Sequence, residues 1–221
     1  VERFLKKYFL YVRTIANLSD IFLLHFQELI SPSSGVDNQR RLPFGLKIEN
    51  NVLKISDEEL FISDPVNLLR IFRESQKSSC QLSSRTLRQV REYSRAMTAA
   101  VRIRQDAGNV FLDILRSPVG VTRIIRQMHE TGVLGKFCPD FAKITGHGQF
   151  DRYHHYTVDA HTIRAIAYAR DVSLMGKNPT IRLAKKLMSE LEKPELLYLA
   201  VLYHDIAKGG GADHSKLGET L

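Results

Sequence analysis

The residues with the clearest capacity for chemistry lie in the last third of the sequence. His204 and Asp205 are adjacent, and Lys208 follows them directly before a run of three glycines. Successive residues of a helix point about 100° apart, so both neighbours can face one cation in front of the groove between them. Imidazole and carboxylate without thiolate favour Mn²⁺, Mg²⁺, Fe²⁺ or Zn²⁺ at a site that is not a structural zinc site.

Such a cation would fit the end of a helix, where the backbone carries a partial negative charge. Water bound to the metal could attack a phosphate ester, and Lys208 could hold a phosphate oxygen as a point charge. The alternative is structural, because a His-Asp pair is a weak motif and a helical residue such as His161 is commonly a hydrogen-bonded core histidine. The apolar run 196–203 that leads directly into His204 favours the metal site.

The elements that must position these residues are predicted to be mainly α-helical. Apolar residues recur at three- and four-residue steps in most of the chain. One β-hairpin is expected, because 44–48 and 52–55 flank Asn50 and Asn51, which tolerate the positive φ of a tight turn. The expected helices are 2–30, one from Asp64-Pro65, 84–104, 118–132, 157–175, 179–191 and 194–208.

Two features of these helices have competing interpretations. The aromatic residues Phe4, Tyr8, Phe9 and Phe22 share helical spacing and are expected to be core residues. Five arginines are expected to form one stripe that is either a solvated helix face or a surface for an anionic partner: Arg85, Arg88, Arg91, Arg95 and Arg102.

The composition is that of an ordinary globular protein. The 221 residues are 43% hydrophobic and 25% charged, with a net charge of +8 that suits an anionic partner. No apolar run reaches the roughly 18 residues of a membrane span, and no signal peptide is apparent. The two cysteines have no partner spacing, so we expect a cytoplasmic protein. The chain begins at Val1 inside an expected helix, and we interpret it as part of a longer protein.

Several stretches carry a family resemblance. Residues 203–209, with His161 upstream, resemble the HD superfamily of metal-dependent phosphohydrolases. Residues 150–162 are similar to the bacterial bifunctional uridylyltransferase/uridylyl-removing enzymes, which modify the nitrogen regulatory protein PII. Residues 64–70 and 132–141 resemble the helical linking domain of the same family.

The resemblance implies both a fold and an activity. It implies a helical linking domain at 1–146 and the N-terminal portion of an all-α HD domain at 147–221. The family transfers UMP from UTP to PII when glutamine is scarce, and its HD domain hydrolyses the UMP when glutamine is plentiful. Carried over, His161, His204 and Asp205 would be ligands of a divalent metal, with Mn²⁺ or Mg²⁺ expected, and Lys208, His214 and Asp213 would be phosphate-binding or second-metal residues.

Two other classes of protein remain open from the sequence. A tRNA nucleotidyltransferase can also join a nucleotidyltransferase to an HD domain, although we do not expect a nucleic-acid partner here. A non-catalytic HD scaffold would use the same histidines structurally. The family's transfer site and its later HD aspartate have no counterpart in this sequence. We therefore expect this chain alone to be inactive, although the whole protein is expected to be an enzyme.

Overall fold

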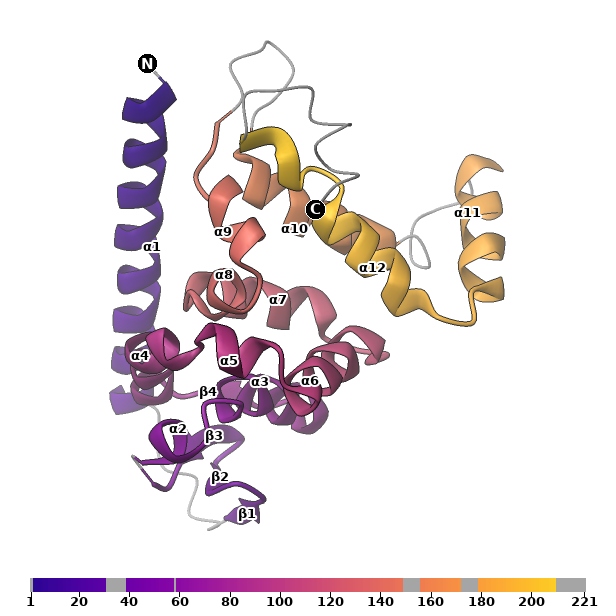
Figure 1. Cartoon of the computed structure of the whole chain (residues 1–221). Coiled ribbons are helices and arrows are strands. Elements are labelled where there is room, and N and C mark those ends of the chain that lie inside the picture. Colours follow the sequence, from indigo (N-terminus) through magenta and orange to yellow (C-terminus); the bar gives the residue numbers. More distant parts are fainter. Residues whose placement is uncertain (1, 31–38, 58, 149–155, 172–178, 210–221) are drawn as a thin grey trace. The chain divides into compact units, whose positions relative to one another are not determined.

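The structure is a computed structural model that describes residues 2–30, 39–57, 59–148, 156–171 and 179–209. Within these residues the chain is mainly helical with one small sheet (Figure 1), which confirms the predicted fold class. The chain divides into two compact units that are described separately. The first unit is residues 11–138, and the second unit is residues 1–10 together with 139–221. None of the helices in the described ranges has the length and apolar character needed to cross a membrane.

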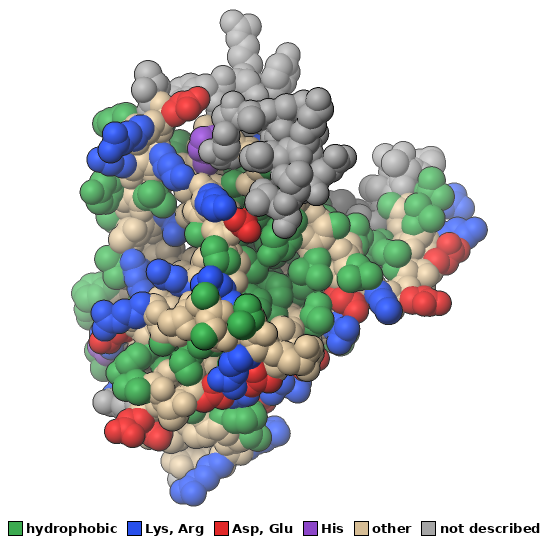
Figure 2. Space-filling view, viewed as in Figure 1, with side chains coloured by type: hydrophobic (Ala, Val, Ile, Leu, Met, Phe, Trp, Pro, Cys, Tyr) green, Lys and Arg blue, Asp and Glu red, His purple; other side chains and the backbone are tan. Residues whose placement is uncertain are grey.

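Helix α1 covers Glu2–Ile30, as predicted, but none of its residues is buried. The expectation that Phe4, Tyr8 and Phe22 are core residues is wrong, since they are 70%, 53% and 60% exposed. Figure 2 shows apolar side chains in green on the surface along this helix, at the left of the view. Helical spacing identifies side chains that share one face, but it does not tell whether another element covers that face.

The sheet of the first unit is built around the predicted hairpin. Strands β2 (Leu46–Glu49) and β3 (Val52–Ile55) pair antiparallel, and Asn50 and Asn51 between them have φ of 51° and 62°. Two short strands were not predicted: β1 (Arg40–Leu42) pairs antiparallel with β2, and β4 (Gln81–Leu82) pairs parallel with β3. They have three and two residues, too few to show an alternating pattern.

The helices of the first unit surround one apolar core. They are α2 (Leu60–Ser63), α3 (Asn67–Ser78), α4 (Ser84–Tyr93), α5 (Ala99–Arg102), α6 (Gln105–Arg116), α7 (Val121–Glu130) and α8 (Val133–Phe137). Helix α3 packs against α6 and α7 through fully buried residues that include Leu68, Phe72, Ile114 and Ile124. The predicted helix start at Asp64 is displaced to Asn67, and the Asp64 carboxylate accepts a hydrogen bond from Val66 N–H at 3.2 Å.

The single helix predicted for 84–104 is wrong. Helix α4 ends at Tyr93, a 3₁₀ turn follows at Ser94–Ala96, and α5 begins only at Ala99. The five arginines therefore do not share one helix face: Arg85, Arg88 and Arg91 belong to α4, Arg95 to the 3₁₀ turn and Arg102 to α5.

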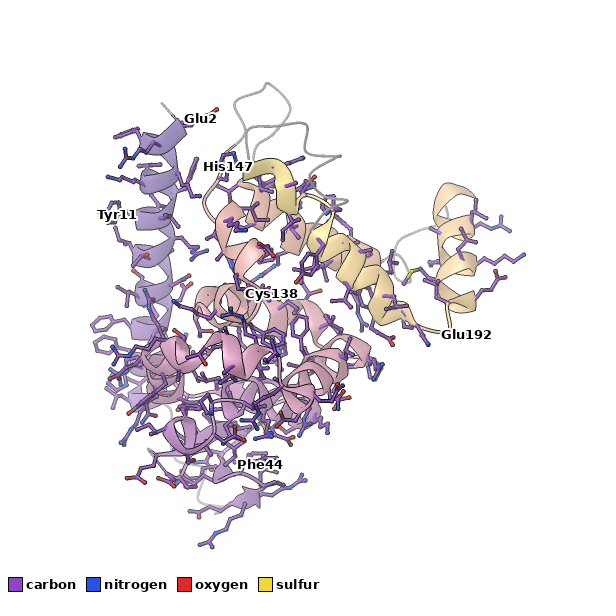
Figure 3. All side chains as sticks on the ribbon, in the orientation of Figure 1. Glu2, Tyr11, Phe44, Cys138, His147 and Glu192 are labelled. Carbon is purple, nitrogen blue, oxygen red and sulfur yellow. The ribbon has the colours of Figure 1, made fainter. Side chains whose placement is uncertain are left out.

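A charge network joins the start of α3 to the start of α6. Arg70 pairs with Asp64, and its Nη2 lies 2.8 Å from Oδ2 of Asp106. Arg104 pairs with both carboxylates: its Nη1 lies 2.8 Å from Oδ1 of Asp64 and its Nη2 lies 2.8 Å from Oδ2 of Asp106. The Arg70 guanidinium also stacks 4.8 Å from the ring centroid of Phe44, which lies in the turn between β1 and β2 and is labelled in Figure 3.

The second unit contains α9 (Pro139–Ile144), α10 (Val158–Asp171), α11 (Pro179–Glu190) and α12 (Pro194–Tyr203), followed by the 3₁₀ helix η2 (Ile206–Gly209). The helix predicted for 194–208 is therefore too long, because α12 ends at Tyr203 and a turn at His204 and Asp205 precedes η2. Helix α10 begins where the sequence predicts and is described as far as Asp171.

Candidate metal centre

Helices α10 and α12 pack against each other and position the candidate ligands (Figure 1). His161 lies in the first turn of α10, where its N–H donates to the carbonyl of Thr157 at 2.8 Å. Ile166 of α10 and Leu202 of α12 are 0% and 1% exposed and belong to the buried apolar contact of this unit. The end of α12 lies near the first turn of α10, since Asp205 directly after α12 is 3.7 Å from Nε2 of His161.

His204 and Asp205 occupy the turn that separates α12 from η2. His204 is the C-terminal cap of α12, with φ −57° and ψ −30°. The Asp205 carbonyl accepts the N–H of Lys208 at 3.1 Å, which begins η2. The pair therefore lies in a tight turn rather than in a continuous helix.

Two of the candidate ligands, His161 and His204, approach one carboxylate oxygen of the third, Asp205. Oδ2 of Asp205 lies 3.2 Å from Nε2 of His204 and 3.7 Å from Nε2 of His161. The three ligand atoms lie within 4.8 Å of one another, and the two imidazole centroids are 5.5 Å apart. Two ligands of one ion at about 2.1 Å can be no more than about 4.2 Å apart, so both nitrogen–oxygen distances fit a shared ion, and the two imidazole nitrogens would have to lie within the same limit when an ion is bound.

The hydrogen bonding of His204 also suits a metal ligand. Its Nδ1 lies 2.6 Å from the carbonyl oxygen of Val201. Because a carbonyl only accepts, Nδ1 carries the proton, and in the neutral ring Nε2 presents a lone pair toward Oδ2 of Asp205. Two lone pairs facing each other need a proton or a cation between them. Metal-bound histidines generally donate their other ring N–H in this way.

Lys208 contacts the same carboxylate oxygen. Its Nζ lies 2.8 Å from Oδ2 of Asp205, and its side chain is 19% exposed. The Asp205 side chain is 10% exposed, whereas those of His161 and His204 are 45% and 39% exposed. The carboxylate therefore forms the floor of the site and the two imidazoles form its solvent-facing edge, where a substrate can approach.

A buried aspartate next to the site ties α10 to the chain before it. Asp159 is 2% exposed, and its Oδ1 accepts the backbone N–H of Gly146 at 3.1 Å. The N–H of Val158 donates to the carbonyl of His147 at 2.9 Å, and His147 is labelled in Figure 3. These bonds fix the start of α10, and with it the backbone of His161.

A cluster of Arg164 with two tyrosines, Tyr168 of α10 and Tyr156 before it, was not predicted from the sequence. Arg164 donates to the hydroxyl of Tyr156 at 2.9 Å and to that of Tyr168 at 3.0 Å and 2.8 Å. The only signal in the sequence was spacing: Arg164 and Tyr168 follow His161 at three and seven residues, on one side of the helix.

The predicted residues Asp213 and His214, and several further histidines, are not brought to this site by the described structure. Asp213 and His214 lie outside the described residues, as do His154 and His155. His25 and His129 are in the first unit, where His129 contacts Arg13 at 2.7 Å and His25 contacts Ser84 at 3.3 Å. Both cysteines are buried in the first unit.

Comparison with known proteins gives a consistent result. A family model described as "Uridylyltransferase GlnD third domain" matches residues 46–137. The chain is 35% identical over 221 residues to the bifunctional uridylyltransferase/uridylyl-removing enzyme of Pseudomonas syringae pv. syringae, covering 99% of this chain and 24% of that enzyme. It is 37% identical to the enzymes of the same description from Stutzerimonas stutzeri and Nitrobacter winogradskyi, again over 99% of the chain and over 24% and 25% of their lengths. The chain thus spans about a quarter of the length of these relatives.

Proposed function

Because this chain belongs to the family of bifunctional uridylyltransferase/uridylyl-removing enzymes, we propose that its second unit carries the metal centre that removes UMP from a uridylylated protein. The reaction class is hydrolysis of a phosphodiester between UMP and a tyrosine. The convergence of His161, His204 and Lys208 on Oδ2 of Asp205 is the observation that carries the proposal.

The donor set fits a catalytic divalent cation. Two imidazole nitrogens and one carboxylate oxygen leave coordination positions open for substrate and water, in contrast to a closed structural site. Mn²⁺ and Mg²⁺ are the ions we propose. A cation held there would polarise a phosphate oxygen and make a water molecule a better nucleophile.

The residues of the chain have separable tasks in this reaction. Asp205 supplies the negative charge that holds the cation, and its burial keeps the carboxylate in one orientation. The Val201 carbonyl fixes the His204 ring so that Nε2 faces the ion position. Lys208 lies close enough to Asp205 to place an ammonium group beside a bound phosphate. The half-exposed imidazoles leave the phosphate a path from solvent.

The activity of the whole protein is a wider proposal. We propose that the protein to which this chain belongs also transfers UMP from UTP, that its target is PII, that glutamine sets the balance between the two reactions, and that it works in the cytoplasm. The relatives' description as uridylyltransferase/uridylyl-removing enzymes supports the two reactions. Asp213 and His214 are proposed to complete the phosphate or second-metal contacts of the same centre.

A direct test is titration of the chain with Mn²⁺, followed by electron paramagnetic resonance of the free ion. We expect one site that is lost in His204→Ala and Asp205→Asn. His147→Ala is the matched control, since it removes an imidazole of the same unit, and within the described residues the hydrogen bonds of His147 are made by its backbone. If His204→Ala lowers stability while Mn²⁺ binding persists, the histidines are structural and the proposal fails.

A further inference from the structure

We propose that Arg164 binds a phosphate oxygen of the substrate at the metal centre, and that Tyr156 and Tyr168 hold its guanidinium in position for this contact. The inference rests on the proposed function, because it assigns a substrate contact to that same centre. It concerns a residue that neither ligates the metal nor belongs to the His-Asp turn.

Arg164 lies on the same strip of α10 as the ligand His161. Val158, Thr162 and Ile166 form the buried face of the helix. Residues three and seven positions after His161 return to its side of the helix, and there Arg164 is exposed and Tyr168 is 45% exposed. The strip therefore begins at the metal ligand and continues along the solvent-facing side of α10.

The guanidinium is placed over the first turn of α10. Side chains of helical residues lean toward the N-terminus and cover the preceding turn. Arg164 follows this rule, because its Nη1 reaches the hydroxyl of Tyr156, which precedes the helix, at 2.9 Å. His161 lies in that same first turn, so the positive charge lies on the His161 side of the helix.

Two tyrosines restrict the guanidinium to this position. Its central carbon lies 4.9 Å from the ring centroid of Tyr156 and 5.3 Å from that of Tyr168. The Tyr168 hydroxyl accepts from Nε and Nη2 at 3.0 Å and 2.8 Å. The planar guanidinium of arginine can stack on aromatic rings and donate several hydrogen bonds at once, which a lysine cannot do. These contacts reduce the side-chain entropy that binding a ligand would otherwise cost.

The charge of Arg164 is not neutralised within the described residues. All of its contacts there are with tyrosines, whereas Arg70, Arg73 and Arg104 of the first unit each pair with carboxylates. The three hydrogen bonds leave one N–H on Nη1 and one on Nη2, and two parallel bonds are how arginine binds a phosphate. Hydrogen bonds to the Tyr168 hydroxyl also raise the pKa of Arg164, so the charge persists at every working pH.

The test measures binding of UMP and of inorganic phosphate to the Mn²⁺-loaded chain by calorimetry. We expect Arg164→Gln to raise the Kd for both probes by about 10- to 100-fold, the range for a charged hydrogen bond, and to leave the Kd for Mn²⁺ unchanged. Tyr168→Phe should weaken UMP binding less, because the ring contact remains when the hydroxyl acceptor is lost. Arg182→Gln, which removes an exposed arginine of α11, is the matched control and should change neither constant.

The possible results distinguish the role of Arg164 from the proposed metal centre. If the unaltered chain binds no Mn²⁺, the proposed metal centre fails first. If Mn²⁺ binds but UMP affinity is the same in Arg164→Gln, or is absent from the unaltered chain, the role of Arg164 is overturned and the metal centre stands. Joint loss of Mn²⁺ and UMP affinity in Arg164→Gln also overturns it, since Arg164 would then stabilise α10 instead of contacting phosphate.

Discussion

Oδ1 of Asp159 accepts the backbone N–H of Gly146 at 3.1 Å, and this bond joins the segment after α9 to the first turn of α10. The carboxylate is 2% exposed. A buried N–H that loses its acceptor costs about 1–3 kcal/mol. We therefore expect Asp159→Ala to lower the free energy of unfolding by about that amount, as measured by chemical denaturation.

Glu190→Ala is the control for this substitution. Its carboxylate is 58% exposed and lies 3.9 Å from Lys186 on α11, so the change should stay within about 0.5 kcal/mol. Equal effects of the two substitutions would contradict a role for the Asp159–Gly146 bond.

Alanine substitutions at two glycines should change the stability of the fold in opposite directions. Gly146 has φ +69°, and an added Cβ would lie 3.0 Å from Cγ of Leu10, so Gly146→Ala should destabilise the fold by about 1–3 kcal/mol. Gly108 lies inside α6 with no atom within 4 Å of an added Cβ, so Gly108→Ala should stabilise it by about 0.5–1 kcal/mol. The unfolding temperatures of both variants test this prediction, and a change of both temperatures in the same direction would refute it.

The network of Asp64, Arg70, Arg104 and Asp106 predicts a loss of stability in acid. The hydrogen bond from Arg104 lowers the pKa of Asp106 below its ordinary value of 3.8. Burial alone would raise the pKa of Asp64, but hydrogen bonds from Arg70 and from Val66 N–H lower it overall. The unfolded chain therefore takes up these protons first as the pH falls, so the contribution is complete above about pH 5 and disappears as the pH falls through the lowered values.

Asp106→Asn isolates this contribution. We expect a deficit of about 0.5–1 kcal/mol relative to the unaltered chain at neutral pH that shrinks below about pH 4 and in high salt, because the Asp106 side chain is 41% exposed. Asp113→Asn removes a single longer contact of 3.4 Å to Arg73 and should show little change. A deficit that stays constant from pH 7 to pH 3 would rule out the charge network as its source.

Metal binding should stabilise the second unit. At a free Mn²⁺ concentration of about 100 times Kd, the free energy of unfolding should rise by about 2.7 kcal/mol, and a chelator should reverse the gain. The rise should vanish in Asp205→Asn and persist in His147→Ala. Stabilisation of Asp205→Asn by the same concentration of Mn²⁺ would place the ion elsewhere.

Replacing Lys208 should change the affinities for the metal ion and for the phosphate ligand in opposite directions. Its ammonium group and the proposed ion share Oδ2 of Asp205, so Lys208→Gln removes a repulsive neighbour and should lower the Kd for Mn²⁺ several-fold. The same variant should raise the Kd for UMP, because a positive charge beside the phosphate is lost. Weakened binding of both ligands would show instead that Lys208 mainly holds the Asp205 turn in place.

Much of the fold could be predicted from local chemistry. The hairpin followed from Asn50 and Asn51, and the length of α1 followed from its apolar spacing. The break after Tyr93 could not be predicted in the same way, because Met97 and Val101 continue the apolar spacing and are both buried. Periodicity records burial, and a 3₁₀ turn with a new helix can bury the same side chains as one continuous helix.

The candidate site could likewise be predicted only in part. The adjacent positions of His204 and Asp205 predicted from sequence alone that the two side chains lie close together, and Nε2 of His204 lies 3.2 Å from Oδ2 of Asp205. The contact of Lys208 with Oδ2 of Asp205 depends on the turn after α12. That turn could not be predicted, because the apolar run up to Tyr203 favours a continuous helix. The Arg164 cluster depends on Tyr156, which precedes α10 and has no helical register to place it.

The parallel pairing of β3 with β4 implies an order in which the first unit folds. The β2–β3 hairpin closes through a two-residue turn, whereas Leu53 meets Leu82 only after α2 and α3 have been laid between them. Closing a loop of about 30 residues costs chain entropy. The few hydrogen bonds of β4 are too weak to offset this cost, since that strand has two residues. The Ser75 hydroxyl of α3 donates to the carbonyl of Cys80, directly before β4, at 2.7 Å, so we expect this edge of the sheet to form together with α3. Hydrogen exchange should find β4 opening together with that helix rather than with the hairpin.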